Sequence, residues 1–91
     1  MYRIVITKKA QEQYKYWKST GNTAIISKII RLLADIAEHP YSGIGKPEAL
    51  RYSLSGKWSR RITRIHRIIY SVNENEVTIH ILSMYTHYSA K

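Results

Sequence analysis

A wide apolar stripe along residues 23–38 is the feature that most limits what this chain can fold into. The stripe recurs with the period of a helix, and polar side chains occupy the opposite face of that helix. We expect the helix to start at Thr23 and to end before Pro40, because a proline disfavours helical geometry in the residue before it. A stripe this wide must be buried against another layer of the protein. Its members are Ile25, Ile26, Ile29, Ile30, Leu32, Leu33, Ile36 and Ala37.

A strand and a second helix are predicted before the stripe. Residues 2–7 are short and rich in β-branched side chains, which favours a strand. Thr7 can cap a helix that begins at Lys8, and the polar run at residues 19–22 breaks this helix. One face of the helix is apolar, so we expect two antiparallel helices that follow one strand. That face consists of Ala10, Tyr14 and Trp17.

Four short strands are predicted after the glycine- and proline-containing loop at residues 41–47. Polar turns separate them, and consecutive strands joined by short turns form an antiparallel meander. The predicted strands are residues 49–54, 58–62, 65–72 and 76–83. The fold class is therefore α+β, with the helices on one face of the sheet and the other face free. Ninety-one residues suffice for one domain, which we expect to span residues 1–91.

The charge of the chain indicates a polyanionic partner. The formal net charge is +9, and repulsion of this size destabilises a compact chain unless a partner uses it. Nucleic acid is the commonest such partner, and arginine suits phosphate oxygens. The same stretch holds one acid, Glu48, which is why an enzyme is considered beside a simple binder. Seven of the fifteen Lys and Arg residues lie between residues 46 and 70: Lys46, Arg51, Lys57, Arg60, Arg61, Arg64 and Arg67.

Composition also limits cofactors and location. Cysteine is absent, which excludes disulfides and thiolate metal sites, and the four dispersed histidines make a poor metal site. We therefore expect no metal and no other cofactor. The apolar run at residues 4–6 is too short for a signal peptide, and no run approaches a membrane span. The expected location is the cytoplasm, without membrane contact.

Alternation along the predicted strand at residues 65–72 assigns its basic side chains to one face of the sheet. Successive side chains of a strand point to opposite faces. Arg67 therefore points to the free face, and the preceding hairpin can place Arg61 beside it. The apolar set that meets the helices is His66, Ile68, Tyr70 and Val72. Three other cations are expected at turns or strand edges, where they supply general electrostatic attraction: Lys57, Arg60 and Arg64.

Three motifs resemble those of a known family. They are GxGKPExL at residues 43–50, LSGxWSRRI at 54–62 and HRxxY at 66–70, and a terminal His87-Tyr88 pair follows. Together with the order strand, helix, helix, strands, they resemble the YoeB/Txe family of toxins, small endoribonucleases of the RelE superfamily. The resemblance covers nearly the whole chain and implies the RelE-like fold.

The resemblance implies ribosome-dependent cleavage of mRNA in the A site, which inhibits translation. The RNA's own 2′-OH attacks, leaving a 2′,3′-cyclic phosphate and a 5′-OH without a metal. Such a reaction needs a base, cationic support for the pentavalent phosphorane and an acid for the leaving oxygen. By resemblance these are Glu48, Arg67 and His87, and Tyr88 orients the substrate. The phosphate-binding residues implied are Lys46, Arg51 and Arg61.

The residues by themselves leave other interpretations open. Glu48 is also typical of a surface carboxylate, and it could orient the sugar instead of acting as the base. Arg67 equally fits a structural ion pair. A lone histidine near a C-terminus, such as His87, usually has no role, although its ordinary pKa of about 6.5 suits proton donation. Tyr85 is a candidate for stacking on bases. The alternative function is a non-catalytic RNA- or ribosome-binding module acting through the basic sheet face.

The resemblance also implies partners. A toxin of this family is made with an acidic antitoxin of the YefM/Axe kind, which we expect to wrap the basic chain as a segment that folds on binding. The ribosome and mRNA are the other expected partners. Operator DNA is contacted only through the antitoxin, and a homodimer stays open.

Overall fold

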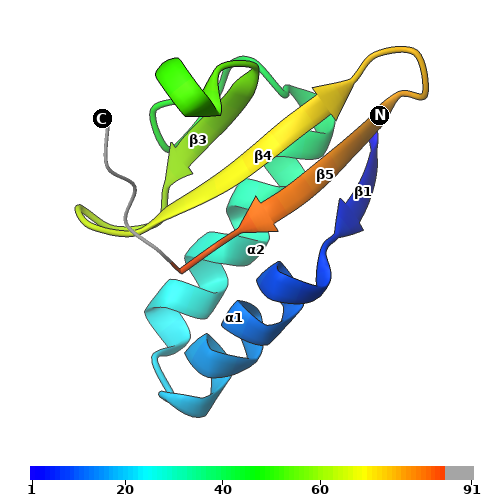
Figure 1. Cartoon of the computed structure of the whole chain (residues 1–91). Coiled ribbons are helices and arrows are strands. Elements are labelled where there is room, and N and C mark those ends of the chain that lie inside the picture. Colours follow the sequence, from blue (N-terminus) through cyan, green and yellow to red (C-terminus); the bar gives the residue numbers. More distant parts are fainter. Residues whose placement is uncertain (86–91) are drawn as a thin grey trace.

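The computed structural model describes residues 1–85, in which two helices pack against one face of a five-stranded sheet (Figure 1). The strand order is β1-β5-β4-β3-β2. The elements are β1 (Arg3–Ile6), α1 (Lys8–Ser19), α2 (Thr23–Glu38), β2 (Glu48–Ala49), the 3₁₀ helix η1 (Tyr52–Leu54), β3 (Lys57–Arg61), β4 (Arg67–Asn73) and β5 (Thr78–Ser83). The predicted α+β class is confirmed.

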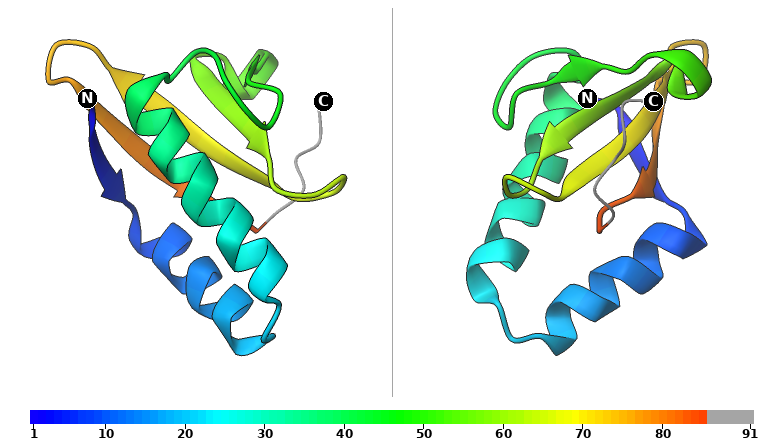
Figure 2. Two further views of the ribbon diagram at one scale, coloured as in Figure 1. Left: turned by 180° about the vertical axis from the view of Figure 1, so that it is seen from behind. Right: turned by 60° about the vertical axis from the view of Figure 1, so that its left-hand side comes forward.

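The sheet is mixed, because β1 pairs parallel with the last strand of the antiparallel meander. Strands β2, β3, β4 and β5 pair antiparallel in sequence order, which confirms the predicted meander. Strand β1 pairs parallel with β5, and Ile4 lies opposite Ile79. The two helices connect β1 to the meander and cover one face of the sheet. The left view of Figure 2, turned by 180° from Figure 1, shows α2 in front of that face and α1 below the end of β1.

Both helices begin at side-chain caps. The Thr7 hydroxyl accepts a hydrogen bond from the Ala10 amide, and Asn22 accepts one from the Ile25 amide. These caps satisfy amides that have no partner inside the helix. The predicted apolar stripe is confirmed at Ile29, Leu32, Ile36 and Ala37, which pack in the core with facing strand residues, whereas Ile30 of the predicted stripe is exposed. Fully buried members are Ala10, Ile29, Leu32, Ile36, Ile68, Tyr70, Ile79 and Ile81.

The predicted strand at residues 49–54 is wrong. Only Glu48–Ala49 form a strand, and Tyr52–Leu54 form the helix η1. The Leu50 amide donates to the Lys57 carbonyl and the Leu50 side chain is buried, so the ladder ends there. Tyr52 then adopts a φ of 59°, which turns the chain out of the extended conformation. β-propensity alone did not reveal this turn.

Strands β4 and β5 each begin two residues later than predicted, at Arg67 instead of residue 65 and at Thr78 instead of residue 76. Before β4, the Thr63 hydroxyl accepts hydrogen bonds from the amides of Ile65 and His66, which extends the turn.

Neither helix of residues 1–85 is long and apolar enough to cross a membrane.

Candidate functional site

Two arginines face each other across the strands of the uncovered sheet face. Arg61 on β3 lies directly opposite Arg67 on β4. Directly opposed side chains of an antiparallel pair share a face, where like charges repel. The register predicted for this hairpin is therefore confirmed, and it creates a pair that is unfavourable unless something negative lies between the two guanidinium groups.

In the part of the chain that the structure describes, the Arg67 guanidinium has donors without acceptors. Its Nε and Nη1 atoms are buried, and neither has a hydrogen-bond partner within residues 1–85. A buried donor left unpaired destabilises the fold, and more so when it is charged. Two adjacent cations, one of them with unsatisfied donors, form a site for an anion such as a phosphate.

Glu48 lies on the same face, one row further along. Its register partner is Ser59 on β3, and Ser59 in turn lies opposite Ile69 on β4. Because Ser59 is two residues from Arg61, the rows of Glu48 and of the arginine pair are separated by roughly 6.6 Å along the strand. Glu48 is exposed, and no ion pair holds its carboxylate in the described part of the chain. An exposed carboxylate and a pair of arginines therefore lie near each other on the open face.

Lys46 stands close to this cluster, whereas Arg51 does not. The Arg61 amide donates to the Gly45 carbonyl at 2.6 Å, so Lys46 follows a residue that is bonded to β3. Arg51 follows Leu50, which pairs with Lys57 at the other end of β3. Four residues of strand, roughly 13 Å, separate Lys57 from Arg61. Both Lys46 and Arg51 are exposed.

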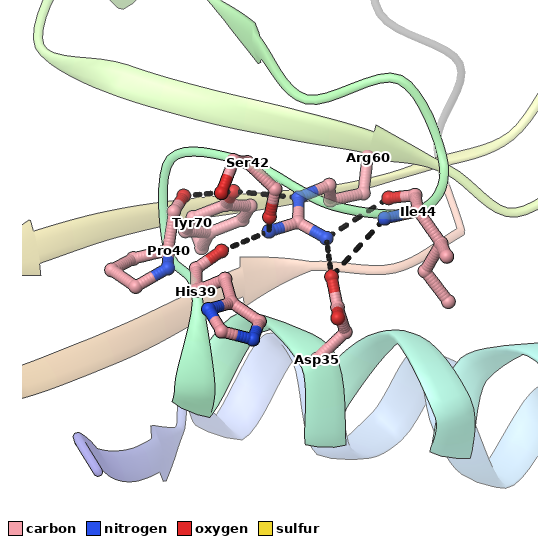
Figure 3. A network of polar contacts seen from close by, with 7 residues as sticks. All are labelled: Asp35, His39, Pro40, Ser42, Ile44, Arg60 and Tyr70. Atoms are coloured by element: carbon pink, nitrogen blue, oxygen red, sulfur yellow. Dashed lines mark hydrogen bonds and ion pairs between the residues drawn. The ribbon is translucent and has the colours of Figure 1, made fainter.

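Arg60 contradicts the expectation of general electrostatic attraction. It points to the helix-covered face, is completely buried and forms an ion pair with Asp35 of α2 at 2.7 Å (Figure 3). All five of its N–H groups are paired: the remaining acceptors are the carbonyls of His39, Ser42 and Ile44 and the hydroxyl of Tyr70. Adjacent strand residues face opposite sides, so Arg60 and Arg61 could not both lie on the open face.

The hydrogen bonds of Arg60 and the burial around it shift the pKa values of Asp35 and Tyr70. The hydrogen bond from Arg60 lowers the pKa of the Asp35 carboxyl, and the Ile44 amide acts in the same direction against the opposing effect of burial. Burial raises the pKa of the Tyr70 hydroxyl, although its bond from Arg60 opposes this. Asp35 therefore stays ionised beside Arg60 at neutral pH.

Replacing Asp35 with Asn is expected to lower the free energy of unfolding by about 3 kcal/mol near neutral pH, because Arg60 then remains buried without its counter-ion. The folded-state pKa of Asp35 lies below its ordinary value of 3.8, so the stability that its charge adds to the fold is present above that pH and disappears as the pH falls further. Urea unfolding should show a gap between wild type and variant that narrows below about pH 4.

The matched control is Glu38→Gln, an exposed acid at the end of the same helix. It should change the unfolding free energy by no more than about 0.5 kcal/mol. A gap for Asp35→Asn that stays constant through acid pH would contradict the role assigned to its charge.

Comparison with known proteins identifies the family. Residues 6–88 match the family described as YoeB-like toxin of bacterial type II toxin-antitoxin system. The chain belongs to this family. A curated YoeB-like relative, Toxin YoeB of Streptomyces coelicolor, is 42% identical over 77 residues, which is 85% of this chain and 90% of that protein. Toxin YoeB of Escherichia coli K12 is 39% identical with the same coverage.

Solved structures of YoeB-like toxins share the fold. The YoeB/ParE toxin from Agrobacterium tumefaciens superposes with a TM-score of 0.87 at 32% identity and covers 94% of this chain and 99% of its own. A chain of the YoeB-YefM complex from Staphylococcus aureus gives 0.81 at 38% identity, covering 97% and 99%. The predicted family and its fold are thereby confirmed.

The structure gives the positions of five of the predicted site residues. It brings together Glu48, Arg61 and Arg67, with Lys46 nearby, and leaves Arg51 apart. His87 and Tyr88 lie outside the described residues, so their roles stay predictions. Within residues 1–85 no three His, Asp or Glu side chains lie close enough to hold a metal ion.

Tyr85, a candidate for base stacking, lies in an aromatic cluster at the end of β5. Its ring stacks on His66 at 4.9 Å with an interplanar angle of 23°, and Trp17 lies 5.4 Å away. The Trp17 indole donates to the Met84 carbonyl at 2.8 Å, which fixes the cluster to the sheet. Tyr85 is 39% exposed, so base stacking by this ring stays a prediction.

Proposed function

We propose that this YoeB-like toxin is an endoribonuclease that cuts mRNA in the ribosomal A site. The observation that carries the proposal is the Arg67 guanidinium, with two buried donors that no acceptor within residues 1–85 satisfies, directly opposite Arg61. A phosphate between the two side chains would satisfy those donors and remove the repulsion. The carboxylate of Glu48 on the same face, which forms no ion pair within residues 1–85, supplies a base within reach of that phosphate's nucleotide.

The proposed reaction is a transesterification within the RNA. Glu48 takes the proton of the 2′-OH, whose oxygen forms a bond to phosphorus. Arg67 stabilises the pentavalent phosphorane, in which negative charge develops on the non-bridging oxygens. The bond from phosphorus to the 5′ oxygen breaks, and His87 gives this oxygen a proton while Tyr88 orients the substrate. The products are a 2′,3′-cyclic phosphate and a 5′-OH, and no metal is required.

The phosphates on either side of the cut are assigned to the remaining cations. We assign Lys46 and Arg61 to the scissile phosphate, because Arg61 lies opposite Arg67 and its amide is bonded to the residue before Lys46. Arg51 follows a residue bonded to the other end of β3, so we assign it to another phosphate of the RNA. The ribosome supplies the mRNA in an extended form, and we place the protein in the cytoplasm with it. The net charge of +9 draws the protein to RNA.

The same charge favours an acidic antitoxin as the inhibitor. Relatives from Staphylococcus aureus are known as a YoeB-YefM complex and as a YoeB dimer. We propose that a YefM-like partner covers the basic sheet face of this chain and so keeps RNA from Arg61 and Arg67. Any operator DNA is then bound by the partner.

A single 2′-deoxy nucleotide tests the cleavage proposal. Ribosomes are programmed with mRNA that carries either the normal nucleotide or its 2′-deoxy analogue immediately 5′ of the cut. The normal RNA should be cut to a 2′,3′-cyclic phosphate end, and the analogue should stay intact because it lacks the nucleophile. Product ends are read by mass spectrometry.

Two results would contradict the proposal. Cleavage of the deoxy analogue would show that water or another group attacks the phosphorus. Binding of programmed ribosomes without cleavage of either RNA would favour the alternative, a non-catalytic RNA- or ribosome-binding module.

A further inference from the structure

The loop that precedes Glu48 is folded around the buried Arg60. This loop, residues 39–47, connects α2 to β2, so it contains Lys46 and leads directly into Glu48. Three of its carbonyls, those of His39, Ser42 and Ile44, accept hydrogen bonds from the Arg60 guanidinium. Figure 3 shows the loop wrapped around this group.

Neighbours of Arg60 tie the same loop down. The Tyr70 hydroxyl donates to the Pro40 carbonyl at 2.7 Å, and the Ile44 amide donates to the Asp35 carboxylate at 3.1 Å. Asp35 therefore contacts both the arginine and the loop. The path of the loop therefore depends on the ion pair between the buried Arg60 and the partly exposed Asp35.

Glycines allow the loop to approach this closely. A Cβ on Gly43 would lie 1.9 Å from Asp35 Oδ2, and a Cβ on Gly45 would lie 2.7 Å from Leu32 Cδ2. Both glycines have positive φ, 122° and 79°. Contact with the ion pair and the core thus explains the glycines of the family-like motif at residues 43–50.

Strand β3 holds the loop through a side chain and through its backbone. On the covered face Arg60 binds the loop carbonyls, and in the strand backbone the Arg61 amide donates to the Gly45 carbonyl. Lys46 then takes a φ of 53°, a conformation that a non-glycine residue keeps only when its surroundings impose it. Two residues later Glu48 pairs with Ser59.

We propose that Arg60 and Asp35 are positioning residues of the site, which hold the loop so that Glu48 and Lys46 keep their place beside Arg61 and Arg67. This inference rests on the proposed function. Neither residue touches RNA, because both act from the covered face of the sheet. Loss of the Arg60–Asp35 ion pair should displace Glu48 from its position beside Arg61 and Arg67. The exposed cations that attract RNA should remain in place.

The variant Gly43→Ala tests this from the loop side without removing a charge. Its Cβ cannot occupy the space taken by Asp35, so the loop must move. We expect kcat on programmed ribosomes to fall about 10²-fold, the effect of a misplacement near 1 Å, while KM changes by less than about threefold. The matched control is Gly21→Ala, which also has positive φ but has nothing within 4 Å of the new Cβ.

Hydrogen exchange of single amides supplies a readout that does not depend on RNA. The Ile44 and Arg61 amides bond to Asp35 and Gly45, so they should exchange at least about tenfold faster in Gly43→Ala. Amides of β5 should be unchanged. A second variant, Asp35→Asn, should show the same faster exchange of the Ile44 and Arg61 amides, with a kcat loss of about tenfold. This variant replaces Gly43→Ala in the test if Gly43→Ala does not fold.

Each result bears on the inference. Faster exchange together with wild-type kcat would overturn the positioning role, and unchanged exchange would overturn the claim that the ion pair holds the loop. A wild-type protein that cuts no RNA would overturn the proposed function, and the exchange rates would still decide what holds the loop.

Discussion

Replacing Arg67 with Met is expected to slow cleavage on programmed ribosomes by about 10²–10³-fold, because a donor aimed at the developing charge is lost. The same change should leave the free energy of unfolding equal or raise it by up to about 1 kcal/mol, since it removes unpaired buried donors and the repulsion with Arg61. Single-turnover cleavage and urea unfolding measure the two effects. Binding to the ribosome should weaken little.

The opposite signs of the two effects distinguish a site residue from a structural one. An arginine held in a structural ion pair would lose stability on replacement and leave the rate unchanged. The matched control is Arg64→Met, an exposed arginine in the turn before β4, whose rate should stay within about threefold of wild type. A stability loss at Arg67 with a normal rate would end the assignment of this residue to the phosphate.

The helices were predictable because their signals are local. The stripe at residues 23–38 has a helical period, and the cap at Thr7 and the break before Pro40 lie within a few residues of the helix ends. The strand at residues 49–54 failed because the turn at Tyr52 depends on the burial of Leu50 and its bond to Lys57, which no local pattern records.

The open face was predictable for a similar reason. Alternation assigns Arg67 to one side of the sheet, and the short hairpin brings Arg61 opposite it. The role of Arg60 required a contact with Asp35, 25 residues earlier in the chain, and three carbonyls of a loop. Alternation did offer one signal, since of two successive arginines on a strand one must face the helices.

Arg60 and Arg67 have different roles in this small basic protein. Arg60 is satisfied by five hydrogen bonds and shapes the fold, whereas Arg67 keeps unsatisfied donors on the open face, as far as residues 1–85 show. Counting cations along residues 46–70 therefore overstates the RNA-binding surface. The unsatisfied group is the one that indicates a ligand.

Replacing His87 with Ala is expected to have the largest effect on rate, about 10²–10⁴-fold, the range for loss of a general acid. His87 lies outside the described residues, so the prediction rests on the family match that extends to residue 88. The measurement is single-turnover cleavage of ribosome-bound mRNA with a normal 5′ oxygen at the cut or with sulfur in its place. A thiolate leaves without needing a proton.

The sulfur substrate should therefore restore much of the rate to His87→Ala. Arg67→Met is the comparison, because stabilising the phosphorane matters whichever group leaves, and its rate should rise little with sulfur. Equal recovery of the two variants would mean that His87 does not protonate the leaving oxygen. A normal rate for His87→Ala with the oxygen substrate would remove this residue from the reaction, and the acid would then have to be sought among groups supplied by the ribosome or the RNA.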